Sequence, residues 1–466
     1  MAVRVKLNEL SLEQKKIIRE KLYLQPKKTN FAVNKFSSVE KDPILFYWID
    51  KPNNEIVLPY TFANALFQKH INSTLSFPPG KFNFTGKLRE EQIPVVEEAL
   101  VQLNDKGTTL LSLPTGFGKS ICSTYLGTKL LNGGLMLILT NRQTIQQGWK
   151  ETVESNTDAA IWVVDSKMKI PSQCNVIITM DGKFEKIPWD IRKMVSVLII
   201  DEAHLMSTST QVPVLLGTCP KYVIACTATL ERTDGMHVMI ENMIGKHRVQ
   251  VKNNKKFVVY KLNTGIQTEL VKNKQGTTDF AALTRDLAFN PLRNAYIVDF
   301  IETNKKLKFM VLSWSVAHCN LLADLLRKRG ESVDMLAGTK SSYIDSRILI
   351  GSISKISTGF DAKNVATNFD GIAIDTLILA GSTKSHNLHI QSIGRVFRSE
   401  FPRIIDLVDD NRISKAHWKE REKNYLEMIC EIKEFQLNKK ELEKEEEDNK
   451  DMHAARLKSF LNKTKA

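Results

Sequence analysis

Residues 109–120 read Thr-Leu-Leu-Ser-Leu-Pro-Thr-Gly-Phe-Gly-Lys-Ser, and this stretch decides the fold of the first half of the chain. The apolar run at 109–113 has the length of a buried strand, and a helix-length segment begins directly after residue 120. Gly116 and Gly118 let the backbone between them turn tightly. A strand, a glycine-rich turn and a helix N-terminus together direct backbone N–H groups at an anion, typically a phosphate.

The loop residues are candidates for nucleotide binding. Lys119 has the reach to contact the β- and γ-phosphates, and the Ser120 hydroxyl is a candidate Mg²⁺ ligand. The strict G-x-x-x-x-G-K-[ST] pattern is not met, because Leu113 stands where the first glycine would be. A glycine-rich turn without a ligand is the alternative, and Lys119-Ser120 at its end argues against it. The predicted nucleotide contacts here are Pro114, Thr115, Gly116, Phe117, Gly118, Lys119 and Ser120.

Two adjacent acids, Asp201 and Glu202, follow the strongly apolar run Val195–Ile200. At the carboxyl end of a parallel strand they are expected at the sheet edge that also carries the phosphate loop. Asp201 is therefore a candidate Mg²⁺ ligand, directly or through water, and Glu202 a candidate base for the attacking water. Solvated capping residues are the alternative interpretation. His204 directly downstream and the preceding phosphate loop favour catalysis.

Two short patterns near these elements are candidates for neighbouring roles. Leu88-Arg89-Glu90-Glu91-Gln92 precedes the first strand by about one helix, and the Gln92 amide could read the edge of an adenine. Thr227-Ala228-Thr229 follows a strand-length run, and its hydroxyls could report the state of the γ-phosphate to a nucleic-acid-binding face. A plain helix start and an ordinary strand-end turn are the competing interpretations.

A further pattern at residues 391–398 reads Gln-Ser-Ile-Gly-Arg-Val-Phe-Arg. Arg395 and Arg398 are three residues apart, so on a helix they share a face. A guanidinium from a second domain can neutralise charge on a transferring phosphoryl group, which makes hydrolysis depend on closure of an interdomain cleft. Gln391, one turn earlier, is a candidate hydrogen-bond partner of the γ-phosphate or its water. Surface charge is the alternative for two such arginines.

Two series of strand-length apolar runs predict an α/β fold with two tandem parallel-sheet domains. The first series lies within 83–250 and the second within 251–414, with a linker near 250–290. Residues 1–82 are expected to form a small accessory domain that either contacts nucleic acid or caps the first domain. Residues 415–466 are charge-dense and predict an exposed, charged helical tail rather than a coiled coil.

Composition narrows the class of protein. The net charge of +14 suits a polyanionic partner, and nucleic acid is the obvious candidate. Six cysteines without C-x-x-C spacing indicate reduced thiols of an intracellular protein. His386 and His389 have no cysteine or carboxylate at ligand spacing, so we expect no metal there. No apolar run approaches the roughly 18 residues needed to span a bilayer, so we expect a soluble protein with no membrane partner.

The ordered set of patterns resembles superfamily 2 helicases of the DEAH-box type, over about residues 84–410. The resemblance implies two RecA-like domains, ATP and Mg²⁺ as cofactors, and a nucleic-acid track. By the resemblance, hydrolysis is carried by Lys119, Ser120, Asp201, Glu202, Gln391, Arg395 and Arg398. Coupling of that site to the track is expected from His204, Thr227, Thr229, Gly359 and Asp361, the last two within Thr358-Gly359-Phe360-Asp361.

Within the superfamily, the extended run at residues 227–235 resembles the XPB-like and UvsW-like branch. Chain length, the N-terminal segment and Asp-Leu-Val-Asp-Asp at 406–410 are similar to helicases of large DNA viruses, of the poxvirus transcript-release type. The chain departs from the family pattern in two places. Leu230 stands where many relatives have proline, and Asn141-Arg142 replaces the usual Pro-Thr after a strand.

The resemblance implies an ATP-dependent translocase that moves 3′ to 5′ and unwinds DNA or a DNA–RNA hybrid. Its expected setting is viral transcription, as transcript release, or replication, with that machinery as partner, in the host cytoplasm and with the virion as a second location. A repair or recombination motor of the XPB/UvsW kind is the alternative. An RNA helicase and a non-catalytic nucleic-acid-binding scaffold are less favoured, the scaffold because Lys119 and Asp201-Glu202 are intact.

Overall fold

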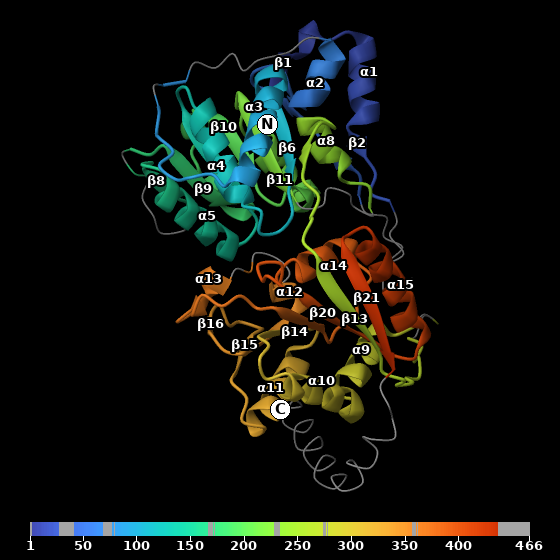
Figure 1. Ribbon diagram of the computed structural model, residues 1–466. Helices are drawn as coiled ribbons and strands as arrows, with labels where there is room; N and C mark the ends of the chain where they lie inside the picture. Colours follow the sequence, from blue (N-terminus) through green and yellow to red (C-terminus); the bar gives the residue numbers. More distant parts are fainter. Residues whose placement is uncertain are drawn as a thin grey trace, which may run out of the picture. The chain divides into compact units, whose positions relative to one another are not determined.

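The computed structural model shows a chain that folds into two compact units, Met1–Lys252 and Asn253–Ala466 (Figure 1). Each unit is built on its own parallel sheet with a hydrophobic core on both faces, which confirms the predicted α/β fold with two RecA-like domains. No helix within the described ranges is long and apolar enough to cross a membrane. The structure describes residues 2–27, 42–68, 77–78, 80–165, 171, 173–227, 234–273, 276, 278–356, 360 and 362–436.

The described part of the first unit contains a seven-stranded sheet in which all neighbouring strands run parallel. Side chains alternate between its faces, so Leu137 and Leu139 join one core layer while Met136 and Ile138 join the other. Burial on both faces explains why the strands are continuously apolar. Across the sheet the order is β12 (Val249–Gln250), β6 (Thr108–Ser112), β11 (Tyr222–Thr227), β10 (Val195–Ile200), β7 (Leu135–Thr140), β9 (Val176–Met180) and β8 (Ile161–Val163).

Helices cover both faces of the first sheet. One face carries α3 (Ile93–Lys106), α4 (Lys119–Leu130) and α5 (Gln143–Asn156), whose apolar sides pack in a common core layer. α3 stops at Gly107, whose φ of 72° supplies the left-handed cap that ends many helices. The other face carries α6 (Trp189–Arg192), α7 (Val212–Leu215) and α8 (Val238–Ile244).

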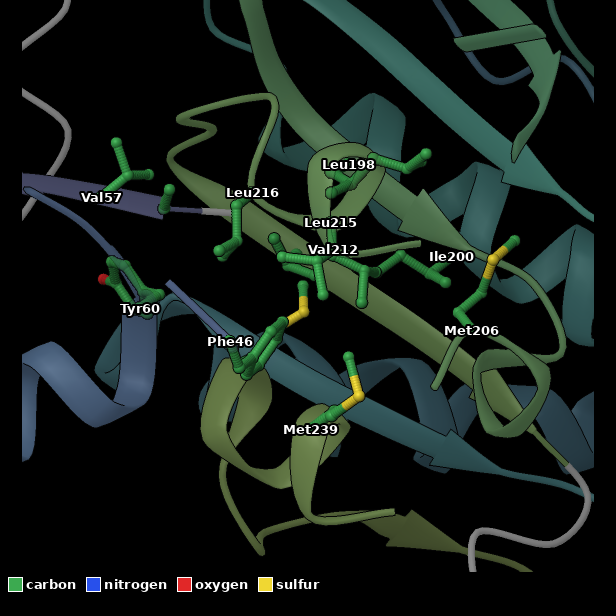
Figure 2. Packing of buried hydrophobic residues seen from close by; sticks show 14 of the residues in the cluster. Phe46, Val57, Tyr60, Leu198, Ile200, Met206, Val212, Leu215, Leu216 and Met239 are labelled. Carbon is green, nitrogen blue, oxygen red and sulfur yellow. The ribbon is translucent and has the colours of Figure 1, made fainter. Parts of the chain in front are cut away.

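The N-terminal segment packs on the first sheet and shares its core. Figure 2 shows Phe46, Val57 and Tyr60 in the same cluster as Leu216 and Met239. Among the described residues of 1–82 this shared core fits the capping alternative, and contact of the segment with nucleic acid stays a prediction. Its elements are α1 (Leu12–Lys21), α2 (Tyr60–Phe67), the antiparallel strands β1 (Ala2–Lys6), β5 (Glu55–Pro59) and β4 (Trp48–Asp50), and the pair β2 (Tyr23–Leu24) and β3 (Ile44–Leu45).

The second unit repeats the architecture, again with seven parallel strands among its described residues. The order is β15 (Val333–Leu336), β17 (Ile348–Ser352), β14 (Phe309–Ser313), β19 (Thr376–Leu379), β20 (Arg403–Val408), β13 (Phe257–Asn263) and β21 (Cys430–Gln436). Its helices are α9 (Phe280–Ala288), α10 (Pro291–Thr303), α11 (Val316–Lys328), α12 (Ile353–Ile356), α13 (Ala362–Val365), α14 (His386–Ile393) and α15 (Arg412–Leu426), and β16 (Tyr343–Ile344) pairs with β18 (Ala366–Thr367).

The linker expected near 250–290 is largely structured. Residues 257–263 form β13, which lies inside the second sheet between β20 and β21. Phe257, Val259 and Leu262 are buried there. The prediction was wrong at this strand because its backbone is satisfied by two neighbours that lie far downstream in the sequence, which the local pattern does not reveal.

The expected exposed helical tail also needs correction. α15 ends at Leu426 and packs inward through Trp418 and Tyr425, and residues 430–436 then form the edge strand β21. The helix prediction fails for β21 because its backbone groups pair with β13 and Ile432 packs against the core of the sheet. Residues 437–466 lie outside the described part of the chain.

Candidate active site

The phosphate loop connects β6 to α4, as its sequence predicts. Gly116 and Gly118 have φ angles of 84° and 96°, which side chains with a Cβ rarely adopt. A Cβ at Gly118 would also lie 2.4 Å from Nε2 of Gln92, so a side chain there would have to displace that amide. α4 begins immediately at Lys119, so the N–H groups of its first turn face the loop. The arrangement is that of an anion site at a helix N-terminus.

Lys119 and Ser120 are the first two residues of α4, so the loop brings both predicted ligands to the same place. Lys119 Nζ lies 3.4 Å from the carbonyl oxygen of Leu113. Leu113 is the residue that departs from the strict motif, and its side chain is buried in the core of the unit. Leucine in place of the first glycine of the motif therefore leaves the loop intact, because the backbone of residue 113 and not its side chain faces Lys119.

Gln92 supports the loop from the preceding segment. Its Oε1 accepts from Arg89 N at 2.9 Å, and its Nε2 donates to the carbonyl oxygen of Phe117 at 2.8 Å. The Arg89 guanidinium donates to the same carbonyl and lies 5.9 Å from the centre of the Phe117 ring. The adenine-reading role of Gln92 stays a prediction, since one end of its amide holds the loop and the other bonds to the backbone of Arg89. Sequence reasoning missed Arg89 as a loop contact, although the quoted motif contains it.

Asp201 lies buried at the carboxyl end of β10, next to the strand that precedes α5. Its Oδ1 accepts from Glu202 N at 2.9 Å, and its Oδ2 accepts from Trp149 Nε1 at 2.7 Å. Burial raises the pKa of the Asp201 carboxyl to about 6, and repulsion from Glu202 adds to the rise. The positive charge of Lys119 and the hydrogen bond from Trp149 oppose this rise by lowering the pKa.

Glu202 connects the acid pair to a buried hydrogen bond. Its backbone is left-handed, with φ of 47°, an unfavourable conformation for a residue with a Cβ. Its Oε2 lies 3.3 Å from His204 Nδ1, and the same nitrogen lies 2.9 Å from the hydroxyl of Thr227, the last residue of β11. The structure thus brings together His204 and Thr227, two of the five residues predicted to couple the site to the nucleic-acid track. The other three, Thr229, Gly359 and Asp361, lie outside the described residues.

The second unit carries Gln391 on α14 and the two arginines just beyond it. Arg395 and Arg398 do not share a helix face, because α14 ends at Ile393 and the backbone continues in tight turns. Gly394 still has helical backbone angles, and beyond it the backbone hydrogen bonds span three residues instead of four, as from Arg395 N to the Ser392 carbonyl. Arg395 Nη1 donates to the Phe360 carbonyl at 2.7 Å. Arg398 is exposed, and Gln391 is buried.

The residues of the first unit fit a magnesium nucleotide. Two loop glycines open the backbone to a phosphate, Lys119 supplies positive charge, and Ser120 and Asp201 offer the oxygen ligands that Mg²⁺ prefers. Within the described ranges, no group of three or more His, Cys, Asp or Glu side chains could hold a metal without a bound ligand. Mg²⁺ commonly takes one or two carboxylates and completes its shell with phosphate and water.

The alternative metal position at His386 and His389 is occupied by other contacts. His386 Nδ1 lies 2.7 Å from Oδ1 of Asn424, and His389 Nδ1 lies 3.0 Å from Nδ2 of the same amide. Burial lowers the pKa of His389 well below its usual range, so it is a neutral core residue. These histidines join α14 to α15.

The fold and the site together define a class of protein, the tandem α/β ATPases with a phosphate loop and an acid pair at a strand end. Comparison with known proteins narrows the class. The family described as "Type III restriction enzyme, res subunit" matches residues 85–232. A relative from Invertebrate iridescent virus 6, named as helicase 161L, is 30% identical over 415 residues, covering 83% of this chain and 91% of the relative.

Further comparisons agree. Helicase 055L of Frog virus 3 is 28% identical and covers 74% of this chain and 79% of its own. L396 of Acanthamoeba polyphaga mimivirus, which is named as an ATP-dependent RNA helicase, is 22% identical. The match covers 93% of this chain and 86% of L396. Dbp5 of S. cerevisiae, bound to RNA and ADP BeF3, shares the fold with TM-score 0.50 at 14% identity, covering 79% of this chain and 93% of its own. A fragment of an HsdR subunit from Vibrio vulnificus YJ016 also shares the fold, with TM-score 0.53 at 16% identity. The match covers 76% of this chain and 70% of the fragment. The chain therefore belongs to the superfamily 2 ATP-dependent helicases, together with these viral helicases.

Proposed function

We propose that the protein hydrolyses ATP to move on DNA or a DNA–RNA hybrid, and that it serves viral transcription, at transcript release, or replication. The observation that carries the proposal is a phosphate loop with two left-handed glycines and Lys119 at the start of α4, in the same sheet domain as the buried Asp201 at the end of β10. The net charge of +14 supports a polyanionic track, because Lys and Arg contacts to phosphates release counterions.

In the proposed site each side chain has a separate task. The loop N–H groups and Lys119 bind the phosphates, while Ser120 and Asp201 hold Mg²⁺, which neutralises charge on the transferred phosphoryl group. Glu202 orients the attacking water and accepts its proton. The left-handed backbone of Glu202 and its contact with His204 hold this carboxylate in one place. Strained backbone at such a position is a common feature of reacting residues.

The contact chain from Glu202 through His204 to Thr227 is the proposed start of coupling to the track. A change in what Glu202 contacts during hydrolysis alters the hydrogen bond available to His204, and Thr227 shares that nitrogen. Thr227 ends β11 and leads directly into the run that holds Thr229. We assign Gly359 and Asp361 of the second unit to the same task.

The arginines of the second unit are the proposed partners of the transition-state charge. Arg398→Ala should retain ATP binding and lose roughly 1,000-fold or more in turnover, as expected for a charge that acts on the transferring phosphoryl group. Phosphate release and fluorescent-nucleotide binding measure the two effects. Arg327→Ala, at a half-exposed arginine of α11, is the matched control and should change neither. Loss of nucleotide binding in Arg398→Ala refutes a transition-state role.

A strand-displacement assay separates the possible tracks. A DNA duplex, a DNA–RNA hybrid and an RNA duplex of the same sequence are compared with ATP and with a non-hydrolysable analogue. The proposal predicts ATP-dependent displacement on the DNA duplex or the hybrid, and none by Glu202→Gln. The name of the mimivirus relative favours an RNA helicase as the second candidate. Displacement on the RNA duplex alone would establish that alternative.

A further inference from the structure

We propose that Trp149 is a positioning residue for Asp201, and that its indole N–H holds the carboxylate in the orientation that binds the Mg²⁺ of the nucleotide. The inference rests on the proposed role of Asp201 as a magnesium ligand. It adds to that role a residue from α5, a helix that none of the sequence motifs includes.

The two oxygens of Asp201 each accept one hydrogen bond. Trp149 Nε1 donates to Oδ2 at 2.7 Å, and the backbone N–H of Glu202 donates to Oδ1 at 2.9 Å. One donor on each oxygen fixes the plane of the carboxylate. A carboxylate has about four lone-pair positions, so both oxygens keep acceptor capacity for a cation or its water. The contacts therefore orient the group without saturating it.

The chemistry of the donor suits this task. An indole N–H donates one hydrogen bond, does not titrate and carries no charge. A lysine or arginine in its place would neutralise the carboxylate and compete with Mg²⁺. Within the described part of the chain, Asp201 makes no direct ion pair with a lysine or arginine, and the Lys119 charge acts on it from a longer distance. Trp149 thus stabilises the carboxylate while leaving its negative charge available.

Packing holds the indole rigidly. Trp149 is 1% exposed and lies on the buried side of α5 with Ile145 and Val153, which are four residues away on either side. α5 packs against α4 and against the edges of β7 and β9. A buried aromatic ring in a close-packed core keeps its rotamer, so the N–H direction is fixed by the helix and not by the carboxylate.

The chain provides a matched control for the test. Trp162, in β8, is 4% exposed and packs in the other core layer of the same unit. Its Nε1 has no hydrogen-bond partner among the described residues. Trp162→Phe and Trp149→Phe therefore remove the same atoms from similarly buried positions, and only Trp149→Phe removes a hydrogen bond.

The experiment measures binding of a fluorescent ADP analogue to the full chain with and without Mg²⁺. In Trp149→Phe we expect the Mg²⁺-dependent gain in affinity to fall by roughly 10- to 100-fold, the usual effect of removing a group that orients a metal ligand. Affinity in the absence of Mg²⁺ should stay at the wild-type value. Trp162→Phe should match the wild type under both conditions.

The outcomes distinguish the inference from the function on which it rests. If Asp201→Asn loses the Mg²⁺-dependent gain and Trp149→Phe keeps it, the positioning role is refuted while the ligand role stands. If Asp201→Asn keeps the gain, the ligand role itself is wrong. Equal loss of affinity with and without Mg²⁺ in Trp149→Phe shows a structural role only and also refutes the inference.

A second variant covers failure of Trp149→Phe to fold. Benzothienylalanine at position 149 keeps the size and shape of the ring and has sulfur in place of the N–H group. The same fall in the Mg²⁺-dependent gain is expected. Wild-type values with this side chain would overturn the proposal, because only the hydrogen-bond donor has been removed.

Discussion

Each of the two sheets of this protein has buried acids within or directly after one of its strands, and the two sheets use these acids in opposite ways. In the first unit Asp201 follows β10 and is held by an uncharged indole and a backbone N–H. In the second unit Asp406 of β20 accepts two hydrogen bonds from the Arg421 guanidinium, at 2.8 and 2.6 Å, and Asp409 accepts from Arg293 at 3.0 Å. All of these groups are buried.

The difference shows how one fold assigns an acid to chemistry or to structure. A carboxylate with a buried guanidinium has its charge compensated inside the protein, and the pair fixes the packing of the elements that carry it. Asp201 has no such partner, and its pKa is raised to about 6 by burial and by Glu202. Its uncompensated charge is available to a cation. The Asp-Leu-Val-Asp-Asp run at 406–410, which resembles viral helicases in sequence, has structural contacts in this fold.

A large loss of activity is expected for Lys119→Ala in the first unit. Removing a preorganised charge from the phosphates should lower kcat by roughly 100-fold or more, by analogy with the loss of a single preorganised donor to a developing anion. Phosphate release at saturating nucleic acid measures it. Lys129→Ala, at the exposed end of the same helix, should turn over normally. Near-normal turnover in Lys119→Ala would place the site elsewhere in the molecule.

The same substitution in both sheets tests the comparison on stability. Asp406→Asn leaves the buried Arg421 without its counter-charge and should lower the free energy of unfolding of the second unit by about 3–5 kcal/mol. Asp201→Asn leaves no cation without a counter-charge. It should therefore change the free energy of unfolding of the first unit by no more than about 1 kcal/mol. Urea titration monitored separately for each unit gives both values. Equal losses would remove the distinction between the two acids.

A pH titration should show a smaller effect on the stability of the second unit. The two ring nitrogens of His318 form hydrogen bonds with Ser313 and Asn294. Burial, together with the nearby charge of Arg293, lowers the pKa of His318 to about 3. The unfolded chain therefore binds this proton before the folded one, and stability falls as the pH drops below about 6.5. Between pH 7 and pH 5, protonation of His318 alone should lower the free energy of unfolding by about 2 kcal/mol.

His318→Gln isolates that contribution. Glutamine keeps hydrogen-bonding groups at the site and does not titrate, so the pH dependence of the second unit's unfolding should shrink by about 2 kcal/mol between pH 7 and 5. Asp201 acts in the opposite sense in the first unit, since a carboxyl with a raised pKa takes up its proton more readily when folded. An unchanged pH slope in His318→Gln would show that this histidine is not the neutral group described.

Much of the fold followed from local sequence patterns. The apolar runs predicted the inner strands of both sheets, since buried parallel strands leave a continuous apolar signal. The loop at 114–120 and the acids Asp201 and Glu202 were predicted because each lies next to such a strand. What the pattern missed was pairing over long sequence distances. β13 and β21 are neighbours in the sheet, although paired residues such as Val258 and Glu431 are 173 positions apart in the sequence.

Trp149 shows why part of the site could not be predicted. Ile145, Trp149 and Val153 repeat at a four-residue spacing, which indicates a buried helix face and nothing more. Its hydrogen bond reaches an acid 52 residues away, and no local signal marks it. The turn geometry of Arg395 and Arg398 was missed for a related reason, because the local pattern at 391–398 does not mark where α14 ends.

The most direct test of the account is the ATPase rate of the wild type and of Glu202→Gln, with no nucleic acid, single-stranded DNA, duplex DNA and RNA. DNA should strongly stimulate hydrolysis by the wild type, and Glu202→Gln should lose hydrolysis under every condition. A Glu202→Gln protein that still hydrolyses ATP at the wild-type rate would contradict the assignment of catalysis to the acid pair at the end of β10.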